Sequence, residues 1–151
     1  MPRPAALDYY ARIGAALFPL PAGSKSPIGI VASFARDCST DPAQWDRWAD
    51  ANPGCNWGMV AGPSGMIICD IDVKTSGRDA AWAAWDKVCK SWGYPEALAP
   101  HVQTPSGGWH VYLKVPKGTN ARALRQPDAL KGLINIRAGN GFVLIPPSTV
   151  S

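Results

Sequence analysis

Two aspartates close an apolar run that reads Met66-Ile67-Ile68-Cys69-Asp70-Ile71-Asp72-Val73. The run predicts a buried strand, and because strand side chains alternate between faces, Asp70 and Asp72 share one face, about 7 Å apart at Cα. Two ionised carboxylates this close repel each other and lose hydration, so the pair favours a cation between them. Mg²⁺ or Mn²⁺, which take oxygen ligands, are the predicted ions. A solvated acidic strand end is the alternative that the pattern leaves open.

A second group of polar residues follows the order Thr104-Pro105-Ser106-Gly107-Gly108-Trp109-His110. Glycines allow backbone N–H groups to approach a phosphate closely, and the Ser106 hydroxyl and the His110 ring add further donors. We therefore predict that Ser106, Gly107, Gly108 and His110 bind a phosphate-bearing ligand. The alternatives are a plain glycine turn and a histidine with a structural role.

The third group lies in Leu133-Ile134-Asn135-Ile136-Arg137, an apolar strand pattern with two polar residues on one face. An arginine there could clamp a triphosphate, because its planar guanidinium matches phosphate oxygens. A surface ion pair of Arg137 is the alternative.

The elements that must position these groups can be predicted from periodicity and turn residues. An amphipathic helix is expected from residue 5 to about Gly14, a strand over 16–20, and a long irregular loop over 21–37 that carries Lys25. Asp41-Pro42-Ala43-Gln44 has the form of a helix N-terminus, so a helix should begin there, bury Trp45 and Trp48, and end at Asn52-Pro53-Gly54.

The remaining pattern predicts strands over 57–60, 66–73, 109–115, 133–137 and 142–145, and a helix over 79–92. The apolar and aromatic residues of that helix recur every three to four positions, which favours a core-facing stripe over a ligand site. The turn-rich segments 61–65 and 138–141, the latter with Asn140-Gly141, predict two hairpins. The fold class is therefore α+β, with a mixed, largely antiparallel sheet and flanking helices.

Composition indicates one cytoplasmic globular domain over residues 1–151. The length suits a single core, 46% of residues are hydrophobic, and no apolar run reaches the roughly 20 residues of a membrane span. The four cysteines lack metal-ligand spacing, so reduced thiols are expected and no structural zinc is predicted. A net charge of +4 is compatible with a polyanionic partner.

Taken together, the motifs resemble the bifunctional DNA primase-polymerase domains of phage and plasmid replication proteins, in the archaeo-eukaryotic primase superfamily. The resemblance runs nearly end to end, in the family's order: Gly14 to Leu20 with Lys25-Ser26-Pro27, Thr40-Asp41 with Trp48, Asn56-Trp57-Gly58, Asp70-Ile71-Asp72, Thr104 to His110, Ile136-Arg137, and Pro146-Pro147-Ser148.

The resemblance implies a primase-like fold with an RRM-like core and a DNA primase and DNA polymerase activity. Asp70 and Asp72 would hold up to two metal ions, and Ser106 and His110 would contact the phosphates of the incoming nucleoside triphosphate. Arg137 and Lys25 are further candidates for phosphate contact. The implied partners are nucleoside triphosphates, a single-stranded DNA template and a primer. The chain would be the N-terminal piece of a larger replication protein, with a helicase among its partners.

The sequence departs from the family pattern at one position. The third metal-binding carboxylate normally stands two residues before the arginine of the 133–137 strand, and here that residue is Asn135. An amide offers one neutral oxygen, so a second metal ion should bind less tightly.

Two alternatives therefore stay open at this point. A primase-like module with Asn135 could bind nucleotide or DNA without turnover. A phosphohydrolase of the haloacid dehalogenase type also uses an aspartate pair after an apolar strand, but it needs a later acidic pair, and after Asp86 only Glu96 and Asp128 remain.

Overall fold

The computed structural model describes residues 3–126 and 133–150, in which helices and strands are interspersed along the chain. Their order is α1 (Leu7–Arg12), β1 (Ala16–Leu20), α2 (Phe34–Asp37), α3 (Pro42–Ala51), β2 (Asn56–Val60), β3 (Met66–Ile71), α4 (Arg78–Ser91), β4 (Val102–Gln103), β5 (Trp109–Lys114), the 3-10 helix η1 (Ala121–Ala123), β6 (Ile134–Arg137) and β7 (Phe142–Ile145).

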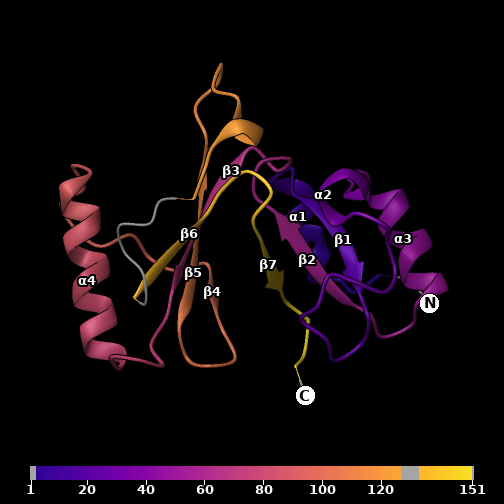
Figure 1. Ribbon diagram of the computed structural model, residues 1–151, viewed down its shortest axis with the longest axis horizontal. Coiled ribbons are helices and arrows are strands. Elements are labelled where there is room, and N and C mark those ends of the chain that lie inside the picture. Colours follow the sequence, from indigo (N-terminus) through magenta and orange to yellow (C-terminus); the bar gives the residue numbers. More distant parts are fainter. Residues whose placement is uncertain (1–2, 127–132, 151) are drawn as a thin grey trace.

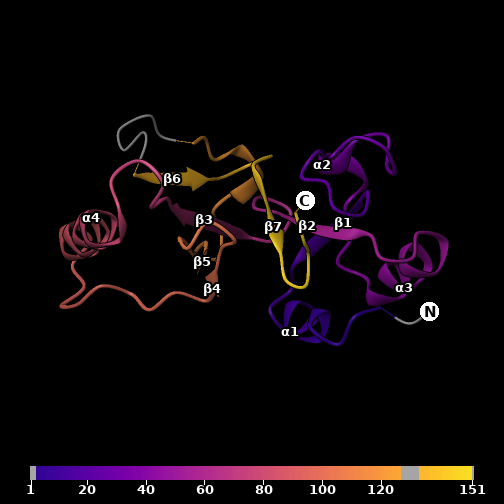
Figure 2. The same cartoon turned by 90° about the horizontal axis from the view of Figure 1, so that it is seen from below.

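The strands form two antiparallel sheets that lie side by side (Figure 1). The first sheet has the order β1-β2-β7, and the second has the order β4-β5-β3-β6. Seen from below, the second sheet lies between α4 on one side and the first sheet on the other (Figure 2). The predicted α+β class with antiparallel pairing and flanking helices is confirmed.

Both predicted hairpins are wrong, because the two turn-rich segments connect different sheets. Segment 61–65 leads from β2 to β3, and 138–141 leads from β6 to β7, while β7 pairs with β2. The two crossovers bond to each other: the Ala61 N–H donates to Gly141 O at 2.9 Å, and the Gly62 N–H donates to Gly139 O at 2.7 Å. Turn residues allow a chain to reverse, but tertiary packing decides which strand it then meets.

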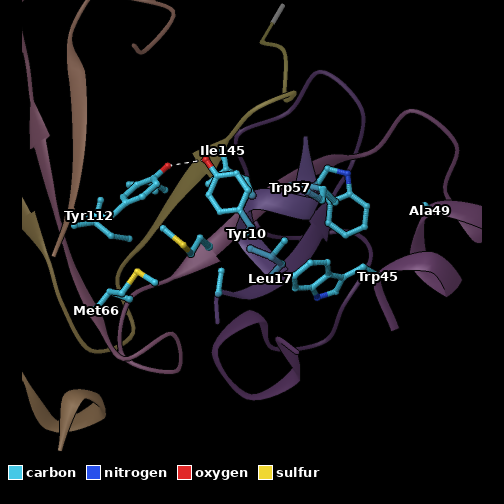
Figure 3. Close-up of a cluster of buried hydrophobic side chains, with 14 residues drawn as sticks. Tyr10, Leu17, Trp45, Ala49, Trp57, Met66, Tyr112 and Ile145 are labelled. Atoms are coloured by element: carbon cyan, nitrogen blue, oxygen red, sulfur yellow. Dashed lines mark hydrogen bonds between the residues drawn. The ribbon is translucent and has the colours of Figure 1, made fainter. Parts of the chain in front are cut away.

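A hydrophobic core fills the space between the two sheets (Figure 3). Trp45 and Trp57 are at most 1% exposed and lie on the side of the first sheet. Across the core, the Tyr10 and Tyr112 hydroxyls hydrogen-bond at 2.9 Å. A second cluster, built around Trp85, fills the space between α4 and the outer face of the second sheet. Apolar side chains on both faces of the second sheet are thus buried, under α4 on one face and toward the first sheet on the other.

Local sequence signals explain where α3 begins and ends. The Asp41 side chain accepts a hydrogen bond from the Ala43 N–H at 3.0 Å, and Pro42 follows at the first helical position. Such a cap stabilises a helix by about 1 kcal/mol. The predicted burial is confirmed for Trp45, while Trp48 is only half-buried.

Smaller departures from the expected elements involve short segments. The loop predicted over 21–37 contains the short helix α2, and the two-residue strand β4 was not predicted. Cys69 and Cys89 are buried free thiols, whereas Cys38 and Cys55 are partly exposed. None of the helices among the described residues combines the length and the apolar character that crossing a bilayer requires.

Candidate functional site

Asp70 and Asp72 lie on the face of β3 that points away from α4. Their neighbours Ile71 and Val73 both belong to the core cluster beneath α4, so strand alternation places the two aspartates on the opposite face. The Asp70 side chain is 23% exposed. The Asp72 N–H donates to Leu133 O at 2.8 Å, which ties the residue after β3 to the start of β6.

The sheet register places a predicted site residue on each side of Asp70. In the antiparallel pairing of β3 with β5, Asp70 lies opposite His110, and in its pairing with β6 it lies opposite Asn135. Directly opposed residues of neighbouring strands share a face with Cβ atoms about 5 Å apart. Three polar side chains from three strands thus form one row across the sheet.

Two positively chargeable groups face the Asp70 carboxylate. His110 Nε2 lies 3.4 Å from Oδ1, and Arg137 Nη2 lies 3.5 Å from Oδ2. Burial raises the pKa of Asp70, but the hydrogen bond and charge of His110, joined by the charge of Arg137, outweigh burial and hold the pKa below its ordinary value. Asp70 is therefore an ionised carboxylate at neutral pH.

His110 and Arg137 also carry buried nitrogens without partners. His110 is 7% exposed, and neither its Nδ1 nor Arg137 Nε has a hydrogen-bond partner within the described residues. Leaving a buried polar group unpaired costs about 1–3 kcal/mol, and such groups gather where a ligand or ordered water completes the hydrogen bonding. Both nitrogens belong to the residues that face Asp70.

The loop before β5 is closed by its own backbone. The Thr104 N–H donates to Gly108 O and the Gly107 N–H donates to Thr104 O, both at 2.9 Å. A Cβ on Gly108 would collide with the carbonyl oxygen of Ile71. The glycine pair therefore serves the turn and the close packing of β5 on β3.

The side-chain hydroxyls of this loop remain near its surface. Thr104 Oγ1 and Ser106 Oγ lie 3.2 Å apart, and Ser106 is exposed. Thr104 was missed as a candidate residue, although it begins the quoted motif, because its hydroxyl meets Ser106 only once the turn has formed. The predicted phosphate contact of Ser106, Gly107 and Gly108 stays a prediction.

Lys25 lies in the loop that follows β1 of the first sheet, whereas the row of Asp70 lies in the second sheet. Asn56 holds this loop: its Nδ2 donates to Ser24 O at 2.8 Å and to Thr149 O at 2.6 Å, and its Oδ1 accepts from the Thr149 N–H at 3.0 Å. In Figure 1 this loop and the loop before β5 lie at the same end of the molecule, on different sheets. Lys25 is exposed and has no ion pair among the described residues.

No group of three or more His, Cys, Asp or Glu residues suited to a metal ion occurs in residues 3–126 and 133–150. Asp70, Asp72 and His110 are of suitable types but do not form such a group, and one Asp72 oxygen accepts a hydrogen bond from the Lys74 N–H at 2.8 Å. Of the two later acids considered for a phosphohydrolase, Glu96 is exposed in the segment after α4, and Asp128 lies outside the described residues.

The two antiparallel sheets, the flanking helices and the row of polar residues on β3, β5 and β6 define a primase-like α+β domain. The chain belongs to the family of bifunctional DNA primase/polymerase N-terminal (Prim-Pol) domains, whose profile matches residues 6–151. The predicted family is thereby confirmed, and the domain is of the primase/polymerase type. No curated protein matches the chain.

Proposed function

We propose that this domain carries out template-directed, divalent-metal-dependent nucleotidyl transfer, and so synthesises and extends primers on single-stranded DNA. The observation that carries the proposal is the register that puts His110 and Asn135 on either side of Asp70. The row combines an ionised carboxylate, a ring nitrogen and an amide, with Arg137 beside them. These groups suit a ligand that is both metal-bound and polyanionic, as a nucleoside triphosphate is.

The donor set fits a divalent cation with oxygen ligands. Asp70 and Asp72 supply two carboxylates from one face of one strand, and the Asn135 side chain supplies a neutral oxygen from the strand beside it. When bound, Mg²⁺ or Mn²⁺ would reduce the negative charge at the attacking and leaving oxygens of the transfer. With two charged ligands instead of three, the site should hold one ion firmly and a second one weakly.

The protein's own cations would orient the triphosphate. Arg137 is 37% exposed and its contact with Asp70, at 3.5 Å, is long, so its guanidinium can donate to a phosphate without leaving its place. Because Nε2 faces the Asp70 carboxylate as donor, the unpaired His110 Nδ1 accepts a hydrogen bond in the neutral ring and donates one to a phosphate in the protonated ring. The hydroxyls of Thr104 and Ser106 are further donors, in the loop that precedes β5.

A primer-synthesis and primer-extension assay with Mg²⁺ or Mn²⁺ tests the proposal. We expect Asp70→Ala to abolish incorporation, because it removes the charged ligand at the centre of the row. We expect Asn135→Asp to raise incorporation, most of all at low metal concentration, because it adds the third carboxylate. Glu96→Gln, which removes an exposed carboxylate outside the row, is the matched control and should behave like the unmodified chain. Equal incorporation by the unmodified chain, Asp70→Ala and Asn135→Asp would refute the scheme.

A second candidate function is a nucleotide- or DNA-binding module without turnover. Asn135 opposite Asp70 favours it, because the row contains only one acidic residue and Asp72 stands outside the register pairs. Titration with nucleoside triphosphates distinguishes the two functions. Tight binding with no incorporation, unchanged by Asn135→Asp, would support the binding module.

A further inference from the structure

A groove lies between α4 and the start of β5, on the face of the second sheet opposite the Asp70 row. Its volume is about 780 Å³, within the range of pockets that hold small organic ligands. Aromatic, charged and small residues line it together: Arg78, Asp79, Trp82, Ala83, Asp86, Pro100 and Trp109.

Two tryptophans form the wall of this groove. Trp82 is 37% exposed, and its ring meets the Trp109 ring edge to face, with centroids 5.3 Å apart. The Arg78 guanidinium lies over the Trp109 ring at 5.5 Å. The sequence predicted a core-facing stripe for this helix, and Trp85 fulfils that prediction with no exposure. Trp82 does not, and an aromatic side chain left open in a groove favours a binding role.

The charges in the groove cancel one another. Asp86 is paired with Lys90 at 2.8 Å, and Arg78 offsets Asp79. A neutral lining suits neither a phosphate chain nor a strongly cationic peptide. It suits a flat group with its own donors and acceptors, because carboxylates accept from base amino groups and guanidinium donates to base oxygens and nitrogens. A nucleobase meets this description, and aromatic side chains supply its stacking surface.

The position of the groove relates it to the Asp70 row. Trp109 precedes His110 on β5, so the two side chains point to opposite faces of the same strand. Arg78 begins α4, which starts at the end of the sheet where β3 ends (Figure 1). Lys74 and Lys87 are exposed in the preceding segment and along the helix, where they can meet phosphates outside the groove. A strand that passes the Asp70 row can therefore continue around this end of the sheet.

We propose that the groove lined by Trp82 and Trp109 binds an unpaired base of the single-stranded DNA template. That the strand is a DNA template rests on the proposed function. That the groove recognises a base rests only on the residues that line it. The base stacks on the tryptophan wall, Asp79 and Asp86 face its edge, and the phosphates remain outside.

The test is a binding measurement without metal or nucleotide, so its result does not depend on whether the Asp70 row transfers nucleotides. The probe is a fluorescein-labelled oligodeoxycytidine of about 12 nucleotides, whose bases carry an amino group, compared with a strand of equal length built from abasic units. Fluorescence anisotropy should show tighter binding of the strand with bases. Trp82→Ala should weaken binding of that strand by about tenfold or more and leave the abasic strand unaffected.

Two further variants separate stacking from folding. Trp82→Phe keeps a ring in the groove and should restore most of the lost affinity. Tyr94→Ala removes an aromatic residue of similar exposure, 41%, outside the groove and should bind like the unmodified chain. Circular dichroism melting of all variants checks that α4 remains folded.

Three outcomes would overturn the proposal. They are unchanged binding by Trp82→Ala, an equal loss for the two strands, and binding of an oligoarginine peptide in place of DNA. The last outcome would assign the groove to a basic protein segment. If the chain extends primers but Trp82→Ala does not weaken DNA binding, the proposed function stands and this inference alone is refuted.

Discussion

Asp70 is the residue on which the electrostatics of the candidate site depend. Burial alone would raise the pKa of its carboxyl group, yet His110 and Arg137 hold the pKa below the ordinary value. A carboxylate that ionises more easily in the folded than in the unfolded state stabilises the fold at every pH above its unfolded pKa, about 3.9. This stabilisation is lost as the pH falls through the lower, folded pKa.

We therefore expect Asp70→Asn to change stability in a pH-dependent way. The variant lacks the ionisation, so its free energy of unfolding should differ from that of the unmodified chain by a constant amount above pH 5. Below about pH 4 the unmodified chain loses the stabilisation from ionised Asp70. The difference should then shift in favour of the variant. Urea unfolding at pH 7 and pH 3 measures the change, and Glu96→Gln, which replaces an exposed carboxylate outside the site, is the control. A difference that is the same at both pH values would contradict the role assigned to His110 and Arg137.

The residue types of the site were predictable, but their mutual placement was not. Apolar context and spacing identified Asp70 and Asp72, and strand alternation put them on one face. That His110 and Asn135 lie directly across from Asp70 is a matter of register between strands far apart in the chain, which a single sequence does not encode locally. Gly108 shows the same limit: its predicted phosphate contact follows from backbone freedom, whereas its packing against Ile71 O depends on the neighbouring strand.

At the scale of elements, nearly every predicted helix and strand is present, and the errors concern their connections. Periodicity identified α4 because its apolar stripe packs on the second sheet, and β5 because its residues alternate as in a strand. The segments 61–65 and 138–141 have the residues of hairpin turns but cross between sheets, because the strand pairs are selected by burial of their apolar faces. The residues that form a turn can be identified from the local sequence, whereas the sheet that a strand joins depends on contacts with distant segments.

Asn56 connects two segments that are far apart in the chain, so its replacement should destabilise the end of the first sheet. The residue is 2% exposed, and its side chain makes three hydrogen bonds to the backbone of Ser24 and Thr149. At about 1 kcal/mol for each bond, Asn56→Ala should lower the free energy of unfolding by about 2–3 kcal/mol. Limited proteolysis should show faster cleavage within the loop that carries Lys25.

Asn52→Ala is the matched control for this prediction. Asn52 makes one side-chain hydrogen bond, from Nδ2 to Trp48 O at 3.0 Å, at the end of α3. Its loss should cost about 1 kcal/mol and leave the proteolysis of the Lys25 loop unchanged. Equal destabilisation by the two alanine variants would mean that Asn56 does not anchor the two segments.

For the whole molecule, the question is what fixes the two sheets relative to each other. The chain crosses between them only at 61–65 and 138–141 within the described residues, and those crossovers bond to one another. Away from the crossovers, the shared core holds the sheets together. The hydrogen bond between the Tyr10 and Tyr112 hydroxyls is a directional contact across that core (Figure 3). Burial raises the pKa of Tyr10 to about 12, so the hydroxyl stays protonated at neutral pH.

A double-mutant cycle on this tyrosine pair should reveal coupling across the core between α1, which carries Tyr10, and β5 of the second sheet. Tyr10→Phe leaves the buried Tyr112 hydroxyl without its partner, and Tyr112→Phe does the converse, so each change should lower the free energy of unfolding by about 1–3 kcal/mol. The double variant removes both hydroxyls and leaves no unpaired group, so its loss should be smaller than the sum of the single losses. Urea unfolding of the four proteins measures the coupling, with Tyr9→Phe as the control on the neighbouring ring. Strict additivity of the two single losses would show that apolar packing alone holds this part of the core. If the hydroxyl pair contributes, each single variant must lose extra stability, because it leaves one buried hydroxyl without a partner.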